Sequence, residues 1–138
     1  MARRIEPRRP AYADTSAFIA FLDRSDSYHP LFRRLFSDPP ALKTSFLVIA
    51  ELHGWFLRRY DGRRAIDALR FIEELNLLEI VGFGSDEFGP VSTLIKRFQD
   101  QPLTLADAHG LVIMRSQRIE DCWSTDRHLS LTGASLVI

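Results

Sequence analysis

Two acidic residues near the end of the chain stand where a carboxylate could bind a cation. Asp107 falls in the first turn of an expected helix, and apolar Leu103 and Leu111 occupy the positions four residues away on either side. Asp126 comes just after a short apolar segment that is expected to form a buried strand. A carboxylate close to apolar groups is costly unless it is paired or binds a metal. The sequence therefore raises the question of which cation these acids serve.

Two further acids extend this set. Asp14 ends the first expected strand, and Glu51 lies about two turns into a later helix, where Leu47, Val48 and Trp55 are its helical neighbours. The four acids supply oxygen donors without basic residues at local spacing, and no Cys or His is spaced as in a zinc site. This donor set favours a hard divalent ion, Mg²⁺ or Mn²⁺.

Each acid also has a purely structural interpretation. Asp107 follows Thr104 by three residues, the pattern of a capping box, and the helix dipole favours acids in a first turn. Asp14 and Asp126 could each cap the turn that follows, and Glu51 could pair with a distant arginine. The metal interpretation depends on convergence, because four independent caps need not meet at one place.

The elements that must position these acids alternate along the chain. Strands are expected at 11–14, 41–44, 77–81, 122–124 and 134–138, and helices begin near residues 15, 26, 46, 62, 91 and 104. This alternation predicts an α/β fold with three α/β/α layers and a central, mainly parallel sheet of about five strands. Ligands gather at the carboxyl ends of parallel strands, so Asp14, Asp107 and Asp126 should share one rim.

Finer expectations concern helix starts, helix faces and special residues. Asp26 is expected to cap the second helix, and Ile66, Leu69, Ile72 and Leu75 should form one apolar stripe on the fourth. Gly54 and Gly110, each three residues after an acid, suggest close helix packing or room beside a metal pocket. Four histidines lack ligand spacing and are expected at the surface or in hydrogen bonds: His29, His53, His109 and His128.

Composition limits the alternatives. The 138 residues fit one domain, and 18 basic side chains balance 18 acidic ones, so net charge indicates no partner. Sixteen of the basic residues are arginines. Arginine is suited to phosphate recognition, but a GC-rich genome would explain the same bias equally well. Residues 1–10 are expected to form a flexible basic arm before a single domain at 11–138. Cys122 is expected in the core, and the sequence predicts a cytoplasmic protein without a membrane segment.

The acidic motifs resemble a known family. Asp14-Thr15-Ser16, Glu51, Leu105-Ala106-Asp107-Ala108 and Ser124-Thr125-Asp126-Arg127-His128-Leu129 are similar, in order and spacing, to the signatures of PIN-domain nucleases. The likeness is particularly to VapC-type toxins of bacterial toxin-antitoxin pairs. The segment Asp26-Ser27-Tyr28-His29 also resembles a segment common in these toxins. The resemblance covers residues 12–138.

The resemblance implies a metal-dependent ribonuclease. Asp14, Glu51, Asp107 and Asp126 would form the Mg²⁺ or Mn²⁺ site, at which a metal-activated water hydrolyses the RNA phosphodiester bond. Thr15 and Ser16 would lend hydroxyls near Asp14, and Ser124 would support the same site. Seven arginines are candidate RNA contacts: Arg33, Arg34, Arg58, Arg59, Arg115, Arg118 and Arg127.

The same resemblance implies a small antitoxin partner and a homodimer. Apolar helix faces could make either contact through Tyr28, Phe32, Phe36, Trp55 and Phe56, although each could equally belong to the core. A PIN-like RNA-processing nuclease outside a toxin-antitoxin pair and a non-catalytic RNA- or protein-binding module remain alternatives. A phosphatase or receiver domain is disfavoured, because Ser16 stands where a phosphatase needs a second aspartate and Lys96 precedes the later strands.

Overall fold

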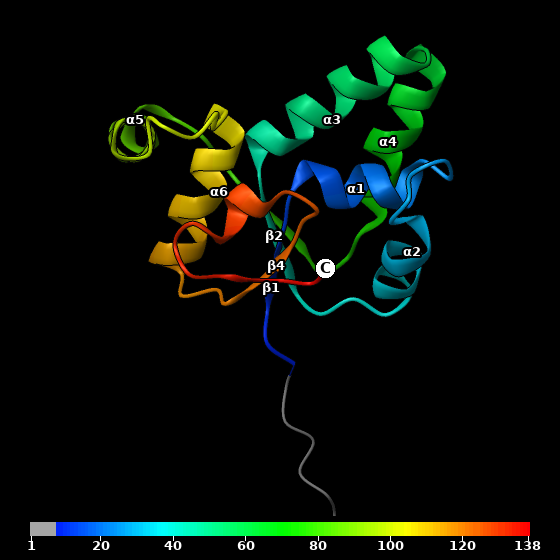
Figure 1. Cartoon of the computed structure of the whole chain (residues 1–138). Helices are drawn as coiled ribbons and strands as arrows, with labels where there is room; N and C mark the ends of the chain where they lie inside the picture. The colour runs from blue at the N-terminus through cyan, green and yellow to red at the C-terminus, as the bar shows by residue number, and fades with distance from the viewer. Residues whose placement is uncertain (1–7) are drawn as a thin grey trace, which may run out of the picture.

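The computed structural model describes residues 8–138 and, within them, one five-stranded sheet (Figure 1). Its strands are β1 (Ala11–Ala13), β2 (Leu42–Ser45), β3 (Leu78–Val81), β4 (Asp121–Trp123) and β5 (Ser135–Leu136). The α-helices are α1 (Thr15–Leu22), α2 (His29–Ser37), α3 (Phe46–Arg59), α4 (Gly62–Glu74), α5 (Ser85–Arg97) and α6 (Leu105–Ser116), and a short 3-10 helix, η1, covers Arg127–Ser130. The strand order is β3-β2-β1-β4-β5, and every neighbouring pair is parallel. The predicted parallel α/β fold is confirmed.

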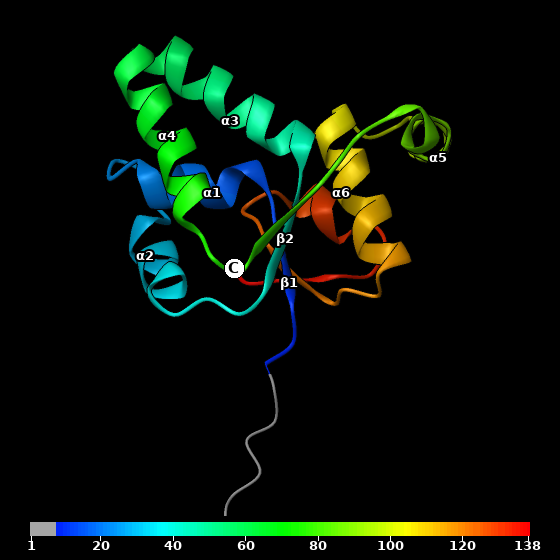
Figure 2. The ribbon, with the colours of Figure 1, turned by 180° about the vertical axis from the view of Figure 1, so that it is seen from behind.

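Helices cover both faces of the sheet. In Figures 1 and 2, α1 to α4 lie on one side of the strands and α5 and α6 on the other. Successive residues of β1 show why: Ala11 and Ala13 join the core beneath α1 to α4, and Tyr12 joins the core beneath α5 and α6. The three-layer α/β/α architecture predicted from the sequence is thus confirmed.

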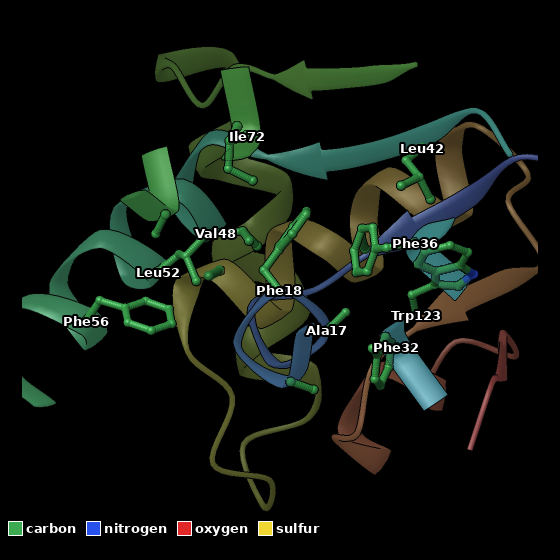
Figure 3. Close-up of a cluster of buried hydrophobic side chains, with 14 of the residues drawn as sticks. Ala17, Phe18, Phe32, Phe36, Leu42, Val48, Leu52, Phe56, Ile72 and Trp123 are labelled. Atoms are coloured by element: carbon green, nitrogen blue, oxygen red, sulfur yellow. The ribbon is translucent and has the colours of Figure 1, made fainter. Parts of the chain in front are cut away.

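An aromatic cluster fills the first of these cores (Figure 3). Phe36 packs edge-on against Trp123 with 5.0 Å between the ring centroids, and tilted against Phe18 at 5.7 Å. Phe32, Phe36 and Phe56 are buried. These three phenylalanines are therefore core residues rather than parts of a partner surface, whereas Tyr28 and Trp55 retain exposure.

Two local expectations are wrong. Asp26 does not cap α2, which begins at His29; its carboxylate accepts a hydrogen bond of 2.8 Å from the Tyr28 N–H in the preceding turn. The buried stripe of α4 consists of Ala65, Ala68 and Ile72, and Ile66 is 55% exposed. Of the predicted stripe, Ile72 is buried and Leu75 packs against the same core, so the expectation is wrong only where Ala65 and Ala68 take the inward positions.

The start of the described chain lies along the other elements. Arg8 donates hydrogen bonds to the backbone of Asp38 and Pro39, and Arg9 forms ion pairs with Glu120 and Asp121. The rest of the expected arm, residues 1–7, lies outside the described residues. Within residues 8–138, no helix combines the length and apolar character needed to cross a bilayer.

Candidate active site

The parallel sheet brings the ends of two strands, and the acids that follow them, to one rim. Ala13 pairs with Trp123 in the β1–β4 ladder, and the Asp14 N–H donates to the Trp123 carbonyl at 3.0 Å. Asp14 follows the end of β1 and Ser124 follows the end of β4, so these two residues are direct neighbours. Asp126 follows two residues later in the same loop, which explains why the sequence places it at this rim.

Asp14 is buried, with 3% of its surface exposed, and is held by two hydroxyls. Ser16 and Ser124 both donate to its Oδ2, at 3.2 and 3.1 Å. Asp14 occupies the N-cap position of α1, but its side chain makes no capping hydrogen bond, so capping does not account for its carboxylate. Burial and the negative charge of Asp107 raise the pKa of Asp14 to about 6, while the hydroxyl hydrogen bonds lower it.

Asp107 combines both interpretations. The capping box is confirmed: the Thr104 N–H donates to Asp107 Oδ2 at 3.1 Å, and Thr104 Oγ1 accepts from the Asp107 N–H at 3.0 Å. The side chain is nevertheless buried, and burial followed by the charge of Asp126 raises the pKa of Asp107. Among residues 8–138 no hydrogen bond reaches its Oδ1, so the cap orients the carboxylate and leaves one oxygen for a ligand.

Asp126 is held by hydrogen bonds within its own loop. Its Oδ1 accepts from the His128 N–H at 2.9 Å and lies 2.8 Å from His128 Nδ1, so it caps η1 as its structural interpretation predicts. The Asp126 N–H donates to Ser124 Oγ at 2.9 Å. His128 was not among the predicted site residues. It lies two residues after Asp126, the spacing at which an aspartate side chain commonly accepts a hydrogen bond from the backbone.

Glu51 faces the same region from α3. Thr15 Oγ1 donates to Glu51 Oε2 at 3.0 Å, so this hydroxyl supports Glu51 and not Asp14 as expected. Glu51 is half-buried, and within the described part of the chain no salt bridge joins it to an arginine or lysine. The alternative of a distant arginine partner therefore receives no support.

The oxygen atoms of these acids suit a hard cation, but the acids do not form a complete coordination site. Across residues 8–138 no three His, Cys, Asp or Glu side chains are gathered closely enough to enclose a metal ion. Asp14 and Asp126 nevertheless follow the neighbouring strands β1 and β4, and the charge of Asp107 raises the pKa of Asp14, as the charge of Asp126 raises the pKa of Asp107. Their oxygens suit Mg²⁺ or Mn²⁺, and neither of the two buried acids has an arginine or lysine partner in the described chain.

The candidate RNA-binding arginines are spread over several surfaces. Arg127 directly follows Asp126 and is exposed, and its side chain lines a hollow with Tyr28, Leu31 and the residues of the C-terminal segment. Arg115 lies about 12 Å along α6 from Asp107, toward the opposite edge of the sheet, and Arg118 follows that helix. The remaining four are exposed on α2 and at the end of α3: Arg33, Arg34, Arg58 and Arg59.

The two helical glycines differ. A Cβ on Gly110 would lie 2.8 Å from the Tyr12 ring, so close packing of α6 on β1 explains this residue. A Cβ on Gly54 would meet only the guanidinium of Arg58, a mobile group. Cys122 is buried, as expected, and burial raises the pKa of its thiol.

Comparison with known proteins agrees with this geometry. A comparison with curated proteins found no match. Among solved structures, the chain is similar to the Mycobacterium tuberculosis toxin VapC20, described as cleaving the sarcin-ricin loop, with a TM-score of 0.82 and 24% identity over 91% of this chain and 96% of that one. A toxin-antitoxin complex from Klebsiella pneumoniae gives 0.62 and 18% identity over 93% and 96%.

A third structure, Rickettsia felis VapBC2 bound to a fragment of its promoter DNA, gives a TM-score of 0.61 and 13% identity over 92% of this chain and 96% of that one. At these identities the likeness concerns the fold. The sequence itself matches the PIN domain over residues 11–133, a span that contains all four acids. On that match, the chain with its acidic rim belongs to the PIN domain family.

Proposed function

We propose that this protein is a metal-dependent endoribonuclease and the toxin of a toxin-antitoxin pair. One observation carries the proposal: Asp14 and Asp107 are both buried, the charge of Asp107 raises the pKa of Asp14, and neither acid forms an ion pair with an arginine or lysine among residues 8–138. Apart from the cap that Asp107 gives to α6, two such carboxylates destabilise the fold, whereas a bound cation would stabilise both. PIN family membership supports a nuclease.

The chain's own residues prepare the acids for a metal ion. Ser16 and Ser124 engage one oxygen of Asp14, and Thr104 engages one oxygen of Asp107, which fixes both carboxylates and leaves their second oxygens free. These two acids would hold the principal Mg²⁺ or Mn²⁺. Such an ion lowers the pKa of water and neutralises charge on a phosphodiester.

Glu51 and Asp126 would complete the site from opposite sides. Thr15 orients Glu51 on α3, and the His128 backbone and ring orient Asp126 in the loop after β4. Because the four acids together repel a phosphate, positive charge must lie near them to admit RNA. Arg127, which is exposed and directly follows Asp126 in the chain, would be the first candidate for that role.

RNA as substrate and a small antitoxin as partner are supported by the likeness to a toxin that cleaves the sarcin-ricin loop and to a toxin-antitoxin complex. We extend the proposal to a homodimer in solution. A short open reading frame next to the gene would support the toxin assignment, and its absence would favour an RNA-processing nuclease outside such a pair.

The test is cleavage of a 5′-labelled RNA with Mg²⁺ or Mn²⁺, with and without EDTA. We expect cleavage that EDTA abolishes, leaving 5′-phosphate and 3′-hydroxyl ends, and a loss of more than about 100-fold in Asp14→Asn and Asp107→Asn. Asp67→Asn, an exposed acid on α4, is the matched control and should keep full activity. Cleavage by folded Asp14→Asn at the wild-type rate would refute the proposal.

A further inference from the structure

A buried hydrogen bond joins the end of β2 to α6. Ser45 Oγ lies 2.6 Å from His109 Nδ1, and neither side chain reaches solvent appreciably. The far side of the imidazole packs edge-on against Phe83, with ring centroids 5.0 Å apart. Burial lowers the pKa of His109.

A buried histidine with one partner is often only a satisfied core residue, but the elements joined here both carry acids. The same Ser45 hydroxyl accepts the Leu47 N–H at 3.0 Å and so caps α3, the helix that carries Glu51 six residues after the cap. His109 lies two residues after Asp107 on α6. One hydroxyl thus connects the helices of both acids.

The adjacent residue fixes α6 against a second strand. Gly110 faces Tyr12 of β1, and a Cβ there would lie 2.8 Å from the phenol oxygen and ring. Tyr12 stands two residues before Asp14 on the same side of the strand. Consecutive residues of α6 are therefore held against β1 and β2, directly below the turn that carries Asp107.

We infer that His109 is a positioning residue, which sets the separation of Asp107 from Glu51 and Asp14 by anchoring α6 to the Ser45 hydroxyl. The inference rests on the proposed metal-dependent function. Without the hydrogen bond, the first turn of α6 can shift relative to α3, and the acids no longer present their oxygens at the spacing a cation requires.

The test compares two substitutions at one site. His109→Leu replaces the imidazole by an apolar side chain of similar size and so removes the hydrogen bond. His109→Asn places an amide group near the position of Nδ1. Ile113→Val, in the same buried helix but away from the acids, controls for a general loss of stability. For each variant, RNA cleavage, the melting temperature and the rise in melting temperature on adding Mn²⁺ are measured.

We expect His109→Leu to lower kcat about tenfold with KM for RNA changed by less than about twofold, because misplaced groups cost rate more than binding. Its Mn²⁺-induced rise in melting temperature should fall, and His109→Asn should restore both quantities at least in part. Ile113→Val should keep the wild-type kcat and Mn²⁺ response even where its melting temperature is equally reduced.

Several outcomes would overturn the inference. These are a wild-type kcat and Mn²⁺ response in His109→Leu, equal impairment of the Leu and Asn variants, or equal impairment of Ile113→Val at matched stability. If wild-type protein neither cleaves RNA nor responds to Mn²⁺, the proposed function itself fails and the inference falls with it. An active wild type with an unaffected His109→Leu variant refutes the inference alone.

Discussion

Replacing Asp14 by Asn should stabilise the metal-free protein while abolishing its activity. In the folded protein, burial and Asp107 raise the pKa of this carboxyl from 3.8 to about 6. Well below pH 3.8 the acid is protonated in both states and contributes no difference. As the pH rises, the unfolded chain loses its proton first, so the folded state is progressively destabilised until the pH passes about 6.

The magnitude follows from the two pKa values. The rise from 3.8 to about 6 corresponds to about 3 kcal/mol of unfolding free energy lost above pH 7. Asparagine carries no charge and can still accept from Ser16 and Ser124 through its carbonyl oxygen. In EDTA at pH 8, Asp14→Asn should therefore be more stable by up to about 3 kcal/mol, a rise in melting temperature on the order of 10 °C.

The assay is urea unfolding at pH 4 and pH 8, with EDTA and then with Mn²⁺. The gain should fall to about 0.5 kcal/mol at pH 4, and at pH 8 it should shrink or reverse with Mn²⁺, because an ion that binds only the folded wild type stabilises it. Asp67→Asn, an exposed acid on α4, should change stability by less than about 0.5 kcal/mol at either pH. A gain in Asp14→Asn that is equal at both pH values would refute the reasoning.

Three further predictions concern the supports of this site. Ser124→Ala removes hydrogen bonds to Asp14 and to the Asp126 N–H, so it should lower stability in urea by about 1 kcal/mol and reduce RNA cleavage. Tyr12→Phe removes a buried hydroxyl that has no hydrogen-bond partner in the described chain, and it should raise stability by about 1 kcal/mol in the same assay. Gly110→Ala should cost about 2 kcal/mol, and the loss should be smaller in the Tyr12→Phe background, because the phenol oxygen is one of the clashing atoms.

The sequence predicted the order of the elements because parallel α/β folds follow from alternating local patterns. The caps at Ser45 and Thr104 and the position of Asp14 before α1 are local features, and the structure confirms them. The helix expected to begin near residue 91 instead begins at Ser85, and the last strand is shorter than expected. The starts of α2 and the buried face of α4 were missed for a common reason. Asp26 could serve a turn or a cap equally well, and period 3.6 allows either Ile66 or Ala65 to face inward until the packing partner is known.

The interactions within the site were less predictable, because they join residues far apart in the chain. The Thr15 hydroxyl could reach either Asp14 or Glu51, and only the approach of α3 to α1 decides in favour of Glu51. The Ser45–His109 bond spans 64 positions, and neither residue belongs to a motif that suggests the pairing. By contrast, the capping box at Asp107 was predictable because both of its partners lie within four residues.

The rim can carry uncompensated acids because the strand beneath it is held from both faces. Ala13 and Trp123 anchor the ends of β1 and β4 in the aromatic core with Phe36, and Tyr12 is held against Gly110 on the other side. A cost of about 3 kcal/mol at Asp14 is a substantial share of the 5–15 kcal/mol that typically stabilises a domain. Packing on this scale is what allows the fold to keep Asp14 and Asp107 buried without a cationic partner, so under the proposed function the burial that destabilises the metal-free protein would also favour the binding of a cation.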